Sequence, residues 1–179
     1  GIMNAVNGGI DSIEHGIYLD ERCVEEMVER GTYLVATLGA INNILVNTDQ
    51  GIPDYAIEKS QRVAEIHRQA IRLFYKAGGK LAAGTDAGTP FNLHGDNARE
   101  LGYLVDVGVS PSDALVAATG NAAALNRIED EGRIAEGNRA DLLLVAGNPV
   151  ADIQAAADKA NHRAVIKRGN VVAGSLDAQ

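Results

Sequence analysis

The segment KLAAGTDAGTP, residues 80–90, sets the expectations for the fold. It begins as a short apolar strand, carries one carboxylate at Asp86, and turns away through Gly88 and Pro90. In a parallel sheet the strand bodies are buried, whereas polar side chains at the carboxyl ends of the strands face the ligand site. We therefore expect Asp86 to lie where this strand opens onto a site.

The rest of the first 126 residues alternates between strand and helix patterns. Strands are expected at residues 11–16, 32–38 and 80–86, and helices at residues 20–31, 54–77 and 97–107. Asp20 is expected to cap the first helix, and residues 39–53 are expected to form a polar loop over the mouth of the site. This alternation predicts an α/β fold with a parallel sheet.

The longest predicted helix, over residues 54–77, has an apolar stripe spaced by three and four residues. The stripe consists of Val63, Ile66, Ala70, Ile71 and Phe74. His67 directly follows Ile66, so packing in the core or on its flank is favoured over a chemical role. The stripe predicts the face on which this helix contacts the sheet.

The pattern changes near residue 126. Ser110 is expected to begin a last alanine-rich helix, whereas the tail contains the strand pattern ADLLLVAG and a predicted hairpin formed by HRAVIKRG and NVVAG. We place a boundary there, which gives an α/β segment over residues 1–126 and a β-rich tail over residues 127–179.

Charge and composition exclude several classes of partner. The net charge is −8, and the longest basic run is the pair Lys167–Arg168, so nucleic acid and anionic membranes are not expected partners. No apolar run approaches the roughly 18 residues of a membrane span. Cys23 is the single cysteine, expected to be a small half-buried residue, and a cytoplasmic location is favoured. The chain starts without Met, in a helix-like pattern that ends at Gly8, so we expect it to be part of a longer protein.

His15 and Asp86 are the candidate chemical pair. Each ends a predicted strand, so both are expected at the same mouth, and imidazole with carboxylate is a ligand combination of hydrolytic zinc. Asp86 has an alternative role as an acid that holds the turn to Pro90, and His15 could simply be hydrogen-bonded at its strand end. His94 could contact substrate or bond its own loop, and His162 is expected on the surface. The glycines match neither a phosphate loop nor a dinucleotide fingerprint, and no serine stands in a Gly-x-Ser-x-Gly elbow.

Several ordered segments carry a family resemblance. They are SIEHG (12–16), AAGTDAGTP (82–90), HGDNARELGYLVDVGVSPSDALVAATGNAAALN (94–126) and GRIAEGNRADLLLVAGNPVADI (132–153). Together they resemble the amidohydrolase superfamily, in its imidazolonepropionase-like and Xaa-Pro-dipeptidase-like branch. The resemblance implies the C-terminal sector, strands 6 to 8, of a metal-dependent (β/α)8 TIM barrel, with part of a small composite β-sandwich in the tail.

The resemblance also implies roles for particular residues. It makes His15 and Asp86 metal ligands at the ends of barrel strands six and eight, and Asp86 the catalytic proton carrier. His94, Gly95 and Asn97 match a segment where a role near substrate is implied. The family's His-x-His on strand one, its lysine on strand four and its histidine on strand five have no counterpart in this sequence.

A function follows from the resemblance as an expectation. It is hydrolysis of a C–N bond in a small amide, dipeptide or cyclic amide, with Zn2+ or another divalent metal that this chain coordinates incompletely. About three protein ligands are needed, so the expected partner is the missing N-terminal barrel sector or another copy of the chain, and the chain alone is expected to be inactive. The alternative is a non-catalytic scaffold or assembly subunit that retains the fold.

Overall fold

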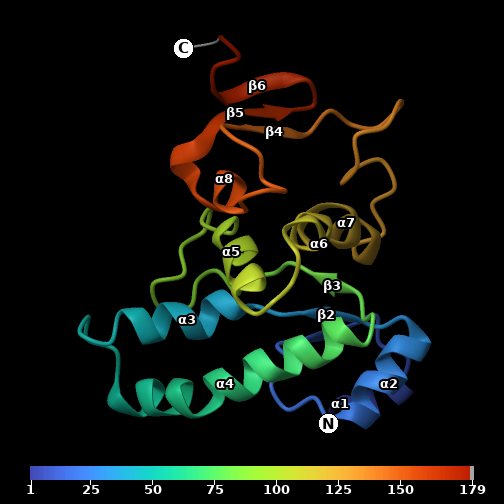
Figure 1. The fold of residues 1–179 in the computed structure, drawn as a ribbon, viewed down its shortest axis with the longest axis vertical. Helices are drawn as coiled ribbons and strands as arrows, with labels where there is room; N and C mark the ends of the chain where they lie inside the picture. Colours follow the sequence, from blue (N-terminus) through green and yellow to red (C-terminus); the bar gives the residue numbers. More distant parts are fainter. Residues whose placement is uncertain (178–179) are drawn as a thin grey trace.

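The computed structural model describes residues 1–177 and contains two separate three-stranded sheets. Figure 1 shows the first sheet among the helices of the N-terminal part and the second sheet at the opposite end of the long axis. The first sheet lies before residue 126 and the second after it, while the boundary itself stays a prediction. No helix among residues 1–177 is long and apolar enough to cross a membrane.

The first sheet is parallel and has the order β1-β2-β3. Its strands are β1 (Ser12–Glu14), β2 (Tyr33–Val35) and β3 (Leu81–Ala82). In the register Ile13 stands opposite Leu34, and Leu34 stands opposite Leu81. These three side chains are buried, which is typical of parallel strands covered by helices. The predicted α/β class and the parallel sheet are confirmed.

Helices occupy most of the remaining N-terminal part. They are α1 (Ile2–Asn7), α2 (Glu21–Arg30), α3 (Leu38–Val46), α4 (Asp54–Lys76), α5 (Arg99–Asp106), α6 (Pro111–Val116), a π-helical turn (Ala117–Asn121) and α7 (Ala122–Leu125). Two predicted helix starts are confirmed, because the Asp20 carboxylate accepts from the Cys23 amide and the Ser110 hydroxyl accepts from the Asp113 amide.

Helix α3 corrects the predicted loop over residues 39–53. β2 ends at Val35, and residues 38–46 are helical. The usual signals of helix ends are absent from α3. Thr37 at the N-cap position makes no side-chain cap bond, and the helix ends at Asn47 without a left-handed glycine. Its start is held instead by a carboxylate from α5.

Helix α4 lies along the first sheet and is longer than any other helix in Figure 1. Val63, Ala70, Ile71 and Phe74 are buried as predicted. Ile66 is 40% exposed, and His67 takes the inward position with only 1% exposed. The predicted packing of His67 is confirmed. The predicted burial of Ile66 is wrong, because the next residue along the helix takes the inward position.

The second sheet is antiparallel, with the order β4-β5-β6. It consists of β4 (Leu142–Val145), β5 (His162–Lys167) and β6 (Asn170–Gly174), and the connection between β4 and β5 contains α8 (Gln154–Ala157) and a 3-10 turn (Lys159–Asn161). The predicted hairpin is confirmed as the β5–β6 pair, which turns at Arg168 and Gly169. Leu142, Leu143 and Leu144 on β4 are all substantially exposed.

The core of the N-terminal part depends on Phe74, which is fully buried against the first sheet. Phe74→Ala is expected to lower the free energy of unfolding by about 3–5 kcal/mol, because it leaves a large cavity. The matched control is Phe91→Ala, since Phe91 is 41% exposed and its loss should cost about 1 kcal/mol or less. Urea unfolding at equilibrium measures both values, and equal losses would contradict the packing.

His67 generates a prediction about acid stability. Burial lowers the pKa of His67 below its ordinary value of 6.5, so the folded state prefers the neutral ring. The unfolded chain takes up the proton near pH 6.5, and the stability present above that pH is lost as the pH falls below it. His67→Gln should make the unfolding free energy less dependent on pH between about 7 and 5. An unchanged slope in His67→Gln would rule out this source of acid sensitivity.

Candidate functional site

The three strands of the first sheet are followed by residues with left-handed backbone. His15 follows β1 with φ 65°, Thr37 follows β2 with φ 51°, and Asp86 follows β3 with φ 53°. Positive φ is uncommon outside glycine and is an outlier for a β-branched residue such as Thr. Such conformations cost about 1–3 kcal/mol each and cluster at functional sites. The strand ends therefore have a backbone geometry that tertiary contacts must hold.

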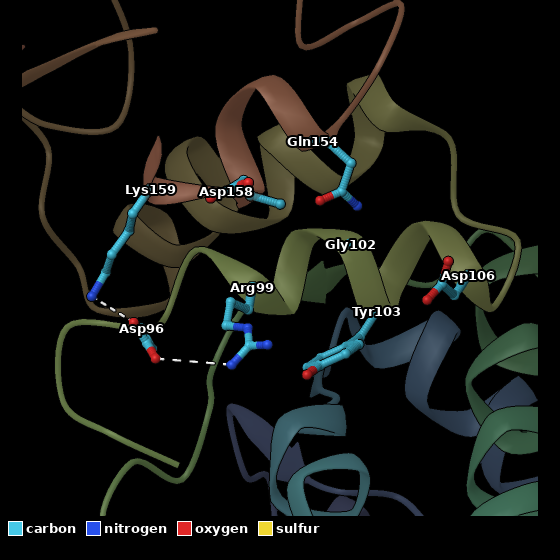
Figure 2. Close-up of a pocket in the computed structure, with 9 residues that line it drawn as sticks. Asp96, Arg99, Gly102, Tyr103, Asp106, Gln154, Asp158 and Lys159 are labelled. Carbon is cyan, nitrogen blue, oxygen red and sulfur yellow. Dashed lines mark ion pairs between the residues drawn. The ribbon is translucent and has the colours of Figure 1, made fainter. Parts of the chain in front are cut away.

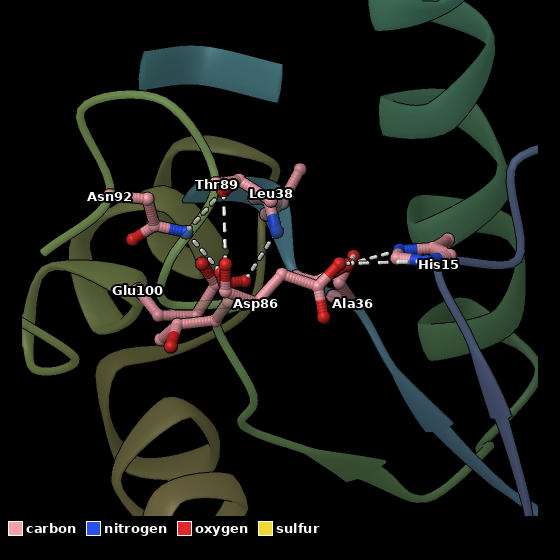
Figure 3. Close-up of polar contacts among 9 residues, drawn as sticks. His15, Ala36, Leu38, Asp86, Thr89, Asn92 and Glu100 are labelled. Atoms are coloured by element: carbon pink, nitrogen blue, oxygen red, sulfur yellow. Dashed lines mark hydrogen bonds and ion pairs between the residues drawn. The ribbon is translucent and has the colours of Figure 1, made fainter. Parts of the chain in front are cut away.

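The predicted pair comes together at this edge. The distance from His15 Nε2 to Asp86 Oδ2 is 3.6 Å, and the two side chains are 44% and 42% exposed, so the pair is open to solvent. Figure 3 shows Asp86 pointing toward the ring of His15. An imidazole nitrogen and a carboxylate oxygen at this separation can form an ion pair, or can both face one bound cation.

Thr37 joins the pair from the middle strand. Its Oγ1 lies 2.6 Å from His15 Nδ1, and the hydroxyl donates to the carbonyl of Ala36 at 2.7 Å. The side chain of Thr37 is buried and that of His15 is partly exposed, so this contact is partly shielded from water. Both ring nitrogens of His15 thus have a defined neighbour, Thr37 on one side and Asp86 on the other.

A hydrogen-bonded turn holds Asp86. The Thr89 amide and hydroxyl donate to the carbonyl of Asp86 at 3.2 and 3.0 Å. The buried Asn92 amide group donates to the carbonyl of Thr85 and to Thr89 Oγ1, and the Gly88 amide donates to the Asn92 carbonyl at 2.8 Å. The side chains of Thr89 and Asn92 hold this turn, the role considered above for the Asp86 side chain. The carboxylate of Asp86 faces His15 instead.

Glu100 is a buried carboxylate next to this turn. Only 1% of it is exposed, and its two oxygens accept from the amides of Leu38 and Gly39 at 2.7 and 2.8 Å. Burial and, to a smaller extent, the charge of Asp86 raise the pKa of Glu100 to about 7, against the lowering effect of the two amide bonds. The sequence reasoning missed Glu100, although an acid next to Leu101 and one turn before Leu104 signals a polar group on an apolar helix face.

The three residues predicted near substrate lie in the segment after the Asp86 turn. His94 is exposed, and its Nε2 lies 3.7 Å from the position that a side chain on Gly88 would take. Gly95 lies close to Lys159, and Asn97 lines a cavity of about 740 Å3 together with Gly84 and Thr85. Their contact with a substrate stays a prediction.

An ion-pair cluster fixes the same segment to the tail. Asp96 pairs with Lys159 at 2.5 Å and reaches Arg99 at 4.0 Å, as Figure 2 shows. The hydrogen bond from Lys159 lowers the pKa of Asp96, so the pair is charged at neutral pH. The adjoining cavity, between α5 and α8, contains neither His15 nor Asp86. The ion-pair cluster therefore anchors the segment that carries His94 and Asn97, and the cavity is separate from the His15–Asp86 pair.

The donors available for a metal are few. Among residues 1–177, no three or more His, Cys, Asp or Glu side chains gather in a way that could hold an ion. Cys23 lies on α2 and has a free thiol, and it is buried rather than half-buried as expected. The donor types of His15 and Asp86 fit a divalent ion, and their number is below the three that hydrolytic zinc takes.

Comparisons with known proteins show which family the chain is similar to. The sequence model of the Amidohydrolase family matches residues 1–172. Ochratoxinase from Aspergillus niger is 35% identical over 157 residues, which is 86% of this chain and 32% of that protein. The chain thus spans about a third of the length of this curated relative.

Solved structures show the same partial correspondence. A Xaa-Pro dipeptidase with methionine bound in its active site is 36% identical with a TM-score of 0.86, over 97% of this chain and 42% of that one. A prolidase in complex with N-methylphosphonate-L-proline is 30% identical with a TM-score of 0.88, over 97% of this chain and 43% of that one. With a family match that extends over nearly all of its residues, the chain belongs to the amidohydrolase family.

Proposed function

We propose that this chain contributes part of the active site of a metal-dependent hydrolase that cleaves C–N bonds in small amides or dipeptides. The observation that carries the proposal is the convergence of His15 Nε2 and Asp86 Oδ2 at the ends of the two outer strands of the sheet. The family match and the similarity to a prolidase and an ochratoxinase support this class of reaction.

The proposed setting is a (β/α)8 barrel in which β1, β2 and β3 are strands six to eight. Such barrels take roughly 250 residues, and a three-stranded parallel sheet leaves β1 and β3 as edges with unpaired backbone groups. We propose that further barrel strands pair with these edges, supplied by more of the same polypeptide or by another copy. The exposed leucines of β4 would be covered by the rest of a composite β-sandwich.

The proposed metal ligands are His15 and Asp86, with the remaining ligands from outside these residues. A divalent ion such as Zn2+, when bound, polarises the carbonyl of a scissile amide and makes water a better nucleophile at neutral pH. Thr37 fixes the ring of His15 from behind, and the Thr89–Asn92 turn fixes the backbone of Asp86. The chain's own contribution is thus a pre-oriented pair of donors.

Asp86 has a second proposed role, in proton transfer. Hydrolysis of an amide requires a base that accepts a proton from water and an acid that gives a proton to the departing nitrogen. The Asp86 carboxylate is 42% exposed at the site, so water and substrate can reach it. We assign both transfers to this carboxylate, and His94 and Asn97 to contacts with the substrate.

The small number of donors also favours a second candidate. Within residues 1–177 only two donors converge, which also suits a scaffold or assembly subunit that retains the fold without the reaction. Metal binding separates the two functions, because a scaffold has no need of it.

Zinc binding tests the proposed site directly. In the protein assembled with the rest of its barrel, His15→Ala should weaken Zn2+ affinity by at least about 10-fold, because a ligand is lost. His162→Ala is the matched control, since the ring of His162 is bonded to the carbonyl of Ala156 in the tail and its loss should leave the affinity unchanged. Competition with a chelator measures both. Equal affinities in His15→Ala and wild type would favour the scaffold.

Asp86→Asn tests proton transfer, because it retains the shape of the side chain and removes the base. In the zinc-loaded protein we expect turnover of a proline-containing dipeptide to fall by about 100- to 10,000-fold. Asp106→Asn, at an exposed position on α5, should retain wild-type turnover. Zinc content is measured in parallel, so that a loss of metal is not taken for a loss of the base. Near-normal turnover with metal bound would exclude the proton role of Asp86.

A further inference from the structure

Thr37 occupies the N-cap position of α3 without acting as a cap. An N-cap threonine normally has extended backbone, and its hydroxyl accepts from an amide in the first turn of its own helix. Here the backbone is left-handed, with φ 51° and ψ 40°, and no side-chain cap bond forms. The hydroxyl is directed instead to the Ala36 carbonyl and His15 Nδ1.

Glu100 supplies the acceptors that Thr37 does not. The two amides that follow Thr37, those of Leu38 and Gly39, donate to the two oxygens of the Glu100 carboxylate. This acceptor comes from a helix more than 60 residues further along the chain and is buried. Figure 3 shows Glu100 and Leu38 on one side of Asp86, with His15 on the other. Helix α3 therefore begins correctly while the hydroxyl of Thr37 stays free for another contact.

The direction of the Thr37 hydrogen bonds fixes the state of His15. A hydroxyl has one hydrogen, which Thr37 donates to the Ala36 carbonyl, so its oxygen accepts from His15 Nδ1–H. The neutral ring then has its lone pair on Nε2, the nitrogen that faces Asp86 Oδ2 at 3.6 Å. A lone pair beside a carboxylate oxygen is the arrangement that a cation needs.

We propose that Glu100 is a positioning residue for this site. By binding the first amides of α3 it replaces Thr37 as the cap, and the freed hydroxyl of Thr37 then holds His15 in the tautomer and orientation that receive a metal ion. The inference rests on the proposed function, since it concerns the same metal site. Without Glu100, the hydroxyl of Thr37 turns to its own helix and releases His15.

A double-mutant cycle tests this coupling in the protein assembled with the rest of its barrel. Glu100→Gln and Thr37→Val are each expected to weaken Zn2+ affinity by about 10- to 100-fold, because a group that orients a ligand is lost. The double variant should lose no more than Thr37→Val alone, because Glu100 acts through the hydroxyl that is already absent. Thr37→Ser, which retains the hydroxyl, should restore affinity close to wild type. Asp106→Asn, on the same helix as Glu100, is the matched control.

The outcomes separate this inference from the proposed function. Losses that multiply in the double variant would overturn it, because Glu100 would then act by another route. Should Glu100→Gln not fold, Gly39→Ala replaces it, since its Cβ would lie 3.3 Å from Glu100 Oε2 and push the carboxylate by a few tenths of an ångström from the amides it accepts from. Gly39→Ala should weaken zinc binding in the presence of Thr37 and have no further effect in Thr37→Val.

A readout that needs no metal gives an independent result. Nitrogen-15 NMR of the metal-free protein should show the Nδ1–H tautomer for His15, and a shift toward Nε2–H in both Glu100→Gln and Thr37→Val. A wild-type ring protonated on Nε2 would overturn the inference even where zinc binds. Absence of zinc binding in wild type together with the Nδ1–H tautomer would overturn the metal site of the proposed function and leave the positioning contact standing.

Discussion

The two hydrogen bonds between the Glu100 carboxylate and the start of α3 are the contact on which the strand-end arrangement depends. They join the segment after β3 to the segment after β2, across the edge where His15 and Asp86 meet. A buried carboxylate is costly unless it is satisfied, and here both oxygens have donors. The bonds also fix the two residues that follow the left-handed Thr37, whose backbone conformation is strained for a β-branched residue.

The apolar core positions the strands, and polar contacts at the strand ends orient the side chains of the site. Strand bodies such as Ile13, Leu34 and Leu81 are packed against helices, and this packing fixes the strand positions. Polar contacts such as those of Thr37 with His15 and of Glu100 with Leu38 lie beyond the last paired residue of each strand. Because parallel strands end at one edge, rigidity of the core is transmitted to the relative positions of His15 and Asp86.

Local patterns in the sequence predicted the features that local physics determines. The caps at Asp20 and Ser110, the long helix α4 and the β5–β6 hairpin follow from short-range signals and were predicted correctly. The pairing of His15 with Asp86 was also predictable, because it requires only that both end parallel strands. The barrel setting and the substrate contacts of His94, Gly95 and Asn97 rest on the family resemblance and stay predictions.

The features that were missed depend on distant residues. Helix α3 looked like a loop because its cap comes from Glu100, more than 60 residues away in sequence. The roles of Thr37 and Asn92 could not be predicted, since a threonine after a strand and an asparagine in a turn are common. Ile66 was expected in the buried stripe and is exposed, because a periodic pattern specifies a helix face only to within about one residue. Tertiary hydrogen bonds and burial decided each of these positions.

The location of the donors has a further consequence for stability. His15 and Asp86 follow the two outer strands, β1 and β3, and the middle strand contributes only the orienting hydroxyl of Thr37. A cation shared by the pair would therefore bridge the full width of the sheet at its open edge. Any ligand that binds only the folded state stabilises it in proportion to the logarithm of its concentration over its dissociation constant. The strain at the three left-handed residues favours disorder of this edge, and a bound ion would oppose it, so order at the strand ends and affinity for the ion are linked.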